Sequence, residues 1–182
     1  MSRNEYDFTL KFLLNDNQVD PSIYVESLGE AGCDDAIIGI GEKGKIALQF
    51  NREAASALEA VTSAINEVLS VIPDAKLIEA TPDLVGLTEI AEIIGFSRQN
   101  MRQLVIRHAQ SFPEPVYSGS LSLWHLLTVL NWFEEKQGKS IATSLKEIAE
   151  TNMQLNLMRE AKKINKSLTS NLLNLLAVKQ VF

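Results

Sequence analysis

The segment from Ser97 to His108 carries the side chains with the most specific chemistry in this sequence. Apolar residues at three- and four-residue spacing predict an amphipathic helix whose buried face holds Met101, Leu104, Val105 and His108. The opposite face holds five polar side chains that suit the edges of bases, namely Arg98, Gln99, Asn100, Arg102 and Gln103. Arginine can pair bidentately with guanine, and glutamine or asparagine with adenine. The alternative interpretation is a solvent-exposed face of an α-helical domain.

The charge around this helix differs from that of the rest of the chain. No acidic residue occurs from Ile93 to Pro113, although the formal net charge of the chain is −6. Residues 1–80 hold 6 basic and 14 acidic residues (−8), residues 81–139 hold 5 and 6 (−1), and residues 140–182 hold 6 and 3 (+3). Because an acidic surface repels a polyanion, any contact with DNA is expected from the later segments.

A second, shorter helix is predicted directly before this one. Leu87, Ile90, Ala91 and Ile94 recur at helical spacing, with Thr88 as the expected N-cap. Gly95 suits the left-handed residue that ends a helix, and Ser97 suits the N-cap of the next one. Two helices joined by so tight a turn predict a helix-turn-helix, whose second helix reads DNA from its first residues.

Residues 84–133 also resemble a known family. The run LTEIAEIIGFSRQNMRQLV, followed by FPEPVYSGSLSLWHLLTVLNWF, resembles the MerR/AlpA-type winged helix-turn-helix of small bacterial or phage regulators and excisionases. The residues that match the start of the β-hairpin wing and the closing helix are Phe112, Pro113, Pro115, Val116, Trp124, Val129 and Trp132. The resemblance implies a winged fold and binding to double-stranded DNA.

The expected wing departs from this family in its charge. Wings of the family often carry Arg or Lys for the DNA backbone, whereas this one has Tyr117, Ser118, Ser120 and Ser122. We therefore expect phosphate contacts from Tyr117, Ser118 and Ser120, together with Ser97 and Arg107. With so few cations, one copy is expected to bind DNA weakly. Two linked copies would bind one DNA molecule with a much higher overall affinity.

Residues 1–80 predict a separate α+β domain. Alternation over 6–14, a helix that Asp20 caps before Pro21, a hairpin over about 34–50, a helix over about 52–71 and a strand at 75–80 give the order β-α-β-β-α-β. The helical stripes expected to be buried include Ile23 and Leu58. This order is that of the ferredoxin-like fold, four antiparallel strands with two helices on one face. Such domains sense small molecules, dimerise or bind partners, and the fold does not choose among these roles.

Three features of this first domain could in principle carry chemistry. The GIGEKGK run at 39–45 lacks the Lys-Ser/Thr pair and following helix of a phosphate-binding loop, so a hairpin turn is favoured. The pair Asp34-Asp35 has no partner at defined spacing and is expected to be solvated. Cys33, the single cysteine, is expected to be a small buried thiol at a turn.

Residues 140–182 contain neither proline nor glycine and predict a helix almost throughout. Its apolar stripe has the spacing of a coiled-coil seam with a polar register position, and indicates oligomerisation. The predicted oligomerisation residues are Ile141, Leu145, Ile148, Asn152, Leu155, Ile164, Leu168, Leu172 and Leu175. The alternative is that this helix folds back over its own two domains.

The composition limits the function classes. No apolar run reaches membrane-spanning length and no basic-then-apolar leader is present, so we expect a cytoplasmic protein without membrane contact. Two histidines and one cysteine make no metal-ligand pattern, so neither a metal nor another cofactor is expected. No nucleophile-base pair or carboxylate pair has suitable spacing, so an enzyme is not expected.

Together these patterns predict an α+β protein with a ferredoxin-like domain (1–80), a winged helix-turn-helix (84–137) and a C-terminal oligomerisation helix (140–182). The predicted function is that of a sequence-specific transcriptional regulator, a homodimer or higher homo-oligomer that reads an inverted repeat with the helix 97–108. The alternative is a protein-binding adaptor or antitoxin, in which the N-terminal domain or the apolar C-terminal tail docks a partner protein.

Overall fold

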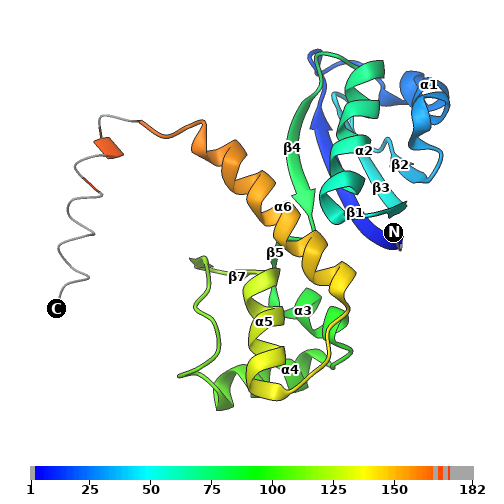
Figure 1. The fold of residues 1–182 in the computed structure, drawn as a ribbon. Helices are drawn as coiled ribbons and strands as arrows, with labels where there is room; N and C mark the ends of the chain where they lie inside the picture. The colour runs from blue at the N-terminus through cyan, green and yellow to red at the C-terminus, as the bar shows by residue number, and fades with distance from the viewer. Residues whose placement is uncertain (1–2, 166–167, 170–171, 173–182) are drawn as a thin grey trace.

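The computed structural model of this chain describes residues 3–165, 168–169 and 172. Within these residues the protein is a mixed α/β structure with two antiparallel sheets, one of four strands and one of three. The two sheets belong to two packed units, and a long helix runs between them (Figure 1). No helix in these ranges combines the length and apolar character needed to cross a membrane.

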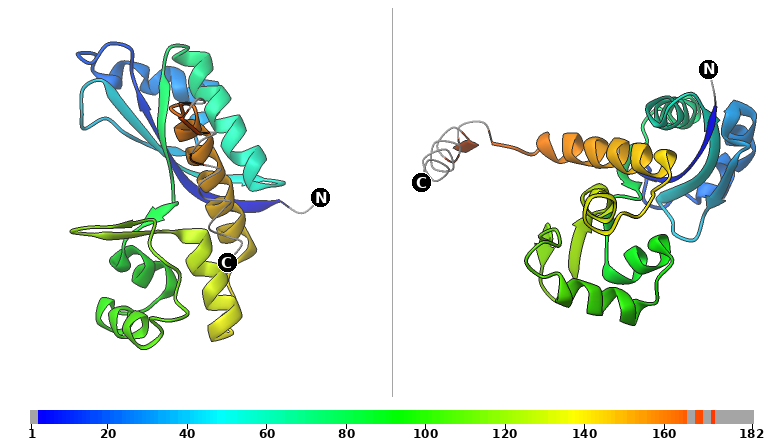
Figure 2. Two further views of the ribbon diagram at one scale, coloured as in Figure 1. Left: turned by 90° about the vertical axis from the view of Figure 1, so that its left-hand side faces the viewer. Right: turned by 60° about the horizontal axis from the view of Figure 1, so that its bottom comes forward.

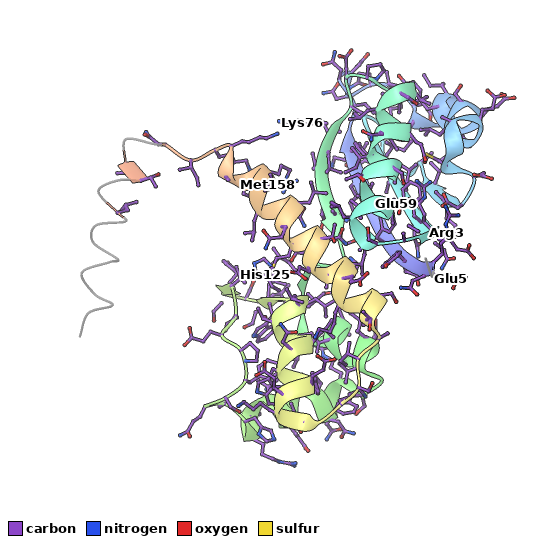
Figure 3. The ribbon with its side chains drawn as sticks, viewed as in Figure 1. Arg3, Glu5, Glu59, Lys76, His125 and Met158 are labelled. Atoms are coloured by element: carbon purple, nitrogen blue, oxygen red, sulfur yellow. The ribbon has the colours of Figure 1, made fainter. Side chains whose placement is uncertain are left out.

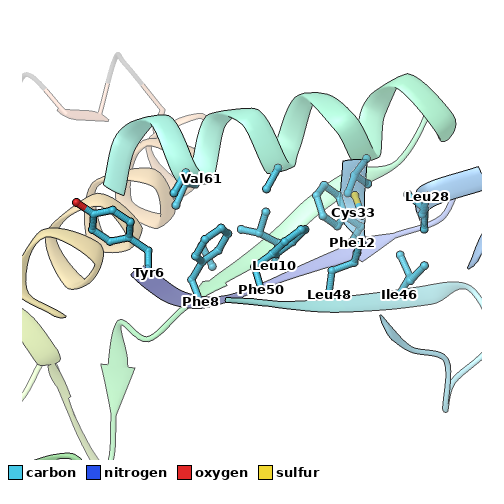
Figure 4. Packing of buried hydrophobic residues seen from close by; sticks show 14 of the residues in the cluster. Tyr6, Phe8, Leu10, Phe12, Leu28, Cys33, Ile46, Leu48, Phe50 and Val61 are labelled. Carbon is cyan, nitrogen blue, oxygen red and sulfur yellow. The ribbon is translucent and has the colours of Figure 1, made fainter. Parts of the chain in front are cut away.

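The N-terminal unit is built on the four-stranded sheet. Its strands are β1 (Asn4–Leu13), β2 (Ala36–Gly39), β3 (Lys45–Ala54) and β4 (Lys76–Thr81), in the spatial order β2-β3-β1-β4. Residues at even positions of β1 and β3 face the helices, and Phe8 and Phe50 stack with ring centroids 5.1 Å apart (Figure 4). The two-residue alternation predicted for β1 therefore places its apolar side chains on the buried face of the sheet.

Two helical regions cover that face. The first passes through a 3₁₀ turn (Pro21–Tyr24), α1 (Val25–Leu28) and a π-type turn (Gly29–Cys33), and the Asp20 side chain accepts a hydrogen bond from the Ser22 amide as predicted. The second is α2 (Ala57–Val71). Two residues expected in the core are instead exposed, Ile23 at 65% and Leu58 at 63%.

The predicted start of the second helix was wrong. Residues 51–54 continue strand β3, because Phe50, Arg52 and Ala54 keep the two-residue alternation of buried side chains. Helix α2 begins only after Ser56, whose hydroxyl accepts a hydrogen bond from the Glu59 amide at 3.2 Å. A serine at this position satisfies one of the amides that a helix start leaves without a partner.

The second unit contains β5 (Leu84–Val85), α3 (Leu87–Ile94), α4 (Arg98–Arg107), β6 (Tyr117–Ser118), β7 (Ser122–His125) and α5 (Leu126–Gln137). Its sheet has the order β5-β7-β6. Gly95 adopts the expected left-handed conformation, with φ 77°, and the Ser97 hydroxyl caps α4 by accepting from the Asn100 amide. The predicted cap at Thr88 was wrong, because α3 begins after Gly86, whose amide donates to the Glu89 carboxylate at 2.7 Å.

Helix α6 (Thr143–Ala161) packs against both units (Figures 1 and 2). Ile148 belongs to the core of the first unit and Ala149 to that of the second, while Leu145 contacts both cores. The Tyr6 hydroxyl adds a hydrogen bond of 2.5 Å to Glu147. The helix therefore folds back over its own chain, which was the alternative expectation.

This packing corrects the predicted coiled-coil seam. Ile148 and Asn152 are buried within their own chain, and Ile141, Leu145 and Leu155 are partly buried against its cores, so the predicted seam packs on the chain itself. The expected continuous helix is also interrupted, since α6 ends at Ala161 and a turn follows at Lys162–Lys163. Farther along, Ile164, Leu168 and Leu172 are exposed, and Leu175 lies outside the described residues.

Polar side chains fix the link between the two units. Asp83 is 2% exposed, and its carboxylate lies 2.6 Å from Nδ1 of His125 and accepts a hydrogen bond from the Asn156 amide at 2.8 Å. Asn156 also bonds to both the N–H and the C=O of Ala80, and Asn152 donates to the Pro82 carbonyl. Side chains of helix α6 therefore hold both the backbone of the link and the side chain of Asp83.

Candidate nucleic-acid interface

Helix α4 presents its polar face because its apolar face is anchored. Met101 is fully buried, while Leu104 and Val105 pack at the margin of the second core. At its end, the ring of His108 meets Trp132 edge-on at a centroid distance of 5.5 Å. All of the predicted base-contacting side chains are exposed, namely Arg98, Gln99, Asn100, Arg102 and Gln103, as are the predicted phosphate contacts Ser97 and Arg107.

The structure divides this set between two concave surfaces. Arg98, Gln99 and Arg102 line a groove of about 970 Å³ together with Ser120 of the β6–β7 hairpin. A separate hollow of about 180 Å³ is lined by Asn100, Gln103 and Arg107, with Phe96 beside them. Residues on a helix are spaced about 100° apart, so five polar residues in six positions span more than one face. The sequence pattern alone treated them as a single surface.

The β6–β7 hairpin stands on an aromatic base. The Trp124 indole donates a hydrogen bond of 2.9 Å to the Pro113 carbonyl, and Phe112 packs edge-on against the same indole with centroids 5.9 Å apart. The Phe-Pro pair and the tryptophan, singled out from the sequence, therefore meet in space. The hydroxyls of Tyr117 and Ser118, with Ser120 at the tip, are exposed as predicted.

Sequence reasoning missed an apolar residue at the tip of this hairpin. Leu121 is 69% exposed and lines the larger groove. Gly119, two residues before Leu121, lies so close to the Tyr117 ring that a side chain would not fit there. A Cβ on Gly119 would lie 2.5 Å from the Tyr117 hydroxyl oxygen. The contacts predicted for the wing are hydroxyl groups, and only the geometry shows which apolar side chain its tip leaves uncovered.

The cations of α4 are free to meet an external anion. Among the described residues, none of Arg98, Arg102 and Arg107 forms an ion pair with a carboxylate. Glu89, the acidic side chain among the residues that line the larger groove, already accepts a hydrogen bond from the Gly86 amide. Exposed guanidinium groups without internal partners suit base edges and phosphates, for which Arg has a rigid fork of donors.

The other candidate features of the sequence have structural roles. Gly44 closes the turn before β3 with φ 71°, and its amide donates to the Val19 carbonyl, so the GIGEKGK run is a turn. Asp35 was expected to be solvated, but its carboxylate accepts hydrogen bonds from Nε and Nη2 of Arg52, at 2.7 and 2.8 Å. No group of three or more His, Cys, Asp or Glu side chains in the described part of the chain could hold a metal ion.

Sequence reasoning also missed the role of Arg52 in this cluster. Its guanidinium is nearly buried and donates to Glu67, Ser63 and the Gly32 carbonyl in addition to Asp35. The signal was an arginine at a core-facing position of an alternating strand, which needs internal partners. Cys33 lies beside the cluster, and burial, with the adjacent Glu67 carboxylate, raises the pKa of its thiol to about 12.

Comparisons of the chain with family models, with curated proteins and with solved structures found no match.

Proposed function

We propose that this protein is a sequence-specific regulator that binds double-stranded DNA. In this proposal residues 84–137 form a winged helix-turn-helix of the MerR/AlpA type, with α4 as the recognition helix and β6–β7 as the wing. Residues 1–80 form a ferredoxin-like domain, for which the antiparallel order β2-β3-β1-β4 is the supporting observation. The resemblance of residues 84–133 to that family supports the assignment of the second unit.

The observation that carries the proposal is the larger groove. It brings Arg98, Gln99 and Arg102 together with the hairpin residue Ser120, although these side chains come from separate elements. A recognition helix with a hairpin at its side is an arrangement that can contact base edges and a neighbouring backbone at once. In this proposal the three α4 side chains contact bases.

The remaining predicted contacts take the phosphate role. Asn100, Gln103 and Arg107 line the smaller hollow of α4, where they would contact the phosphates of the adjacent DNA strand. Ser97 and the hydroxyls of Tyr117, Ser118 and Ser120 complete the set. Base contacts confer sequence specificity and phosphate contacts confer affinity and position, so the two groups predict different mutant behaviour.

The proposal includes two copies on one DNA site. The wing contributes no cation, so the electrostatic part of the affinity from one copy is small. Because the predicted seam residues as far as Leu155 pack within their own chain, the exposed Ile164, Leu168 and Leu172 are the residues we propose for contact between copies. Repression by occupying a promoter in the cytoplasm is the simplest mechanism.

Selection of bound duplexes from a random DNA library, at low and at high salt, tests this function. We expect an enriched motif with inverted symmetry and an affinity that falls steeply as salt rises.

Replacing Gln99 and Arg102 together by alanine should abolish preference for the motif, whereas Lys136→Ala, at an exposed position of α5, should leave it unchanged. Arg107→Ala should weaken binding to all sequences and lower the salt slope by about 1. Recovery of no motif would refute the proposed function.

A further inference from the structure

A groove of about 820 Å³ lies between the start of β4 and the C-terminal part of α6. Its floor is apolar and is formed by Leu77, Ile78, Leu155 and Met158. Met158 is 67% exposed, a large fraction for an apolar side chain inside a groove. Lys76 and Met158 lie at the same end of the molecule, next to the C-terminal part of α6 (Figure 3).

The rim of this groove is basic. It carries Lys76, Arg159, Lys162 and Lys163 against one acid, Glu160, a net charge of +3. Glu160 is already engaged by both Arg159 and Lys163, at 2.9 and 2.8 Å. In the described part of the chain, Lys76 and Lys162 have no carboxylate partner, and the Nε atom of Arg159 is buried without an acceptor. The rim therefore holds cations that the chain does not neutralise.

One wall of the groove is an open strand edge. Strand β4 is at the end of the sheet order and pairs with β1 on one side. On the other side, Asn156 of α6 occupies the N–H and the C=O of Ala80. Among the described residues, no side-chain hydrogen bond covers the backbone of Lys76, Leu77 or Ile78, so those of their N–H and C=O groups that face away from β1 can pair with an added strand.

We propose that this groove binds an extended acidic segment of another protein, which adds to the edge of β4. Backbone hydrogen bonds to the outward groups of residues 76–78 would hold the segment, and alternate apolar side chains would cover Leu155 and Met158. Its carboxylates would meet the unpaired Lys76 and Lys162. Charge complementarity selects this occupant, because the rim offers unpaired cations beside an apolar floor. DNA would use the cations but would leave the apolar floor without a partner.

The groove is separate from the proposed DNA contacts. Its rim comes from β4 and the end of α6, whereas the larger groove at α4 is formed by α3, α4 and the β6–β7 hairpin. A regulator with both surfaces could hold DNA and a protein partner at the same time. The peptide site stands whether or not the proposed DNA-binding function is correct.

Selection from a random peptide library displayed on phage, with the full-length protein as bait, tests the site. We expect enriched peptides in which acidic and apolar residues alternate. Synthetic versions should bind the double variant Lys76→Glu/Lys162→Glu roughly tenfold or more weakly than the unaltered protein, with the loss reduced by salt. The matched control is Lys136→Glu, a reversal at an exposed lysine of α5 remote from the groove, which should leave peptide binding unchanged.

Three results would overturn the proposal. One is the enrichment of no motif, or of a motif without acidic residues. Another is a charge-reversed variant that keeps peptide affinity but loses DNA affinity, which would assign the cations to nucleic acid. The third is a change from dimer to monomer in sedimentation of the same variant, which would make the occupant a second copy. Circular dichroism of each variant separates these results from misfolding, and the DNA library selection reports separately on the proposed function.

Discussion

Replacement of Asn156 by alanine tests whether α6 holds the two units together through the link at residues 80–83. The Asn156 side chain makes three hydrogen bonds there: its amide nitrogen donates to the Ala80 carbonyl at 2.7 Å and to the Asp83 carboxylate at 2.8 Å, and its oxygen accepts the Ala80 amide at 3.0 Å. Alanine removes all three bonds. It also leaves the buried Asp83 carboxylate with His125 as its one remaining side-chain partner among the described residues.

The expected loss follows from these bonds. The two bonds to the Ala80 backbone contribute about 1 kcal/mol each, and the bond to a buried carboxylate contributes about 1.5–3 kcal/mol. The free energy of unfolding should therefore fall by about 3–5 kcal/mol. In a chain of this size each 1 kcal/mol shifts the melting temperature by about 2–4 °C, so a fall of roughly 6–20 °C is expected.

Urea denaturation followed by circular dichroism measures this loss. The matched control is Gln154→Ala, because Gln154 lies on the same helix and is exposed. We expect the control to change the free energy of unfolding by less than about 0.5 kcal/mol. If Asn156→Ala were no less stable than the control, the bonds at Ala80 and Asp83 would not contribute to stability and the reasoning would be refuted.

Three further predictions concern the N-terminal unit. Arg52→Met should lower the free energy of unfolding by about 3–5 kcal/mol in urea denaturation, since Asp35 and Glu67 lose a buried cation; a loss below about 1 kcal/mol would contradict this. Because the pKa of the Cys33 thiol is raised from 9.0 to about 12, only the unfolded chain loses this proton above pH 9, so stability should fall as the pH rises from 9 to 12. Denaturation midpoints against pH should show a weaker fall in Cys33→Ala, and equal curves would exclude this cause. Gly44→Ala should lower the melting temperature, because φ is 71° and a Cβ would lie 2.5 Å from Cα of Asn17, whereas Gly41→Ala, with no atom within 4 Å, should not.

Local patterns explain the parts of the fold that the sequence predicted well. The alternation of Tyr6, Phe8, Leu10 and Phe12 allows one sheet face to be buried, and β1 has that face in the core. The helix boundary at Gly95 and Ser97 was equally clear, because a left-handed glycine and a serine cap are local requirements of the backbone. The exposure of the polar face of α4 followed from helical periodicity in the same way.

The features that the sequence did not predict depend on distant partners. Asn152 and Ile148 fit a coiled-coil seam by spacing, yet the same spacing suits a helix that packs on two units of its own chain. Asp35 looked solvated because its partner, Arg52, lies 17 positions away on strand β3. Spacing along one helix also could not show that Asn100 and Arg102 line different surfaces, because that depends on where the hairpin lies.

The position of α6 in the chain has a consequence for biosynthesis. Both hydrophobic cores use residues from this helix, Ile148 in one and Ala149 in the other, and α6 is the last of the helices described. On the ribosome, residues 1–137 are synthesised before the segment that covers Tyr6 and the Ala80 edge of β4, and they also leave the exit tunnel before it. Both units therefore complete their cores only after α6 has emerged, and a chain that ends before Ile148 lacks the residues of α6 that belong to both cores.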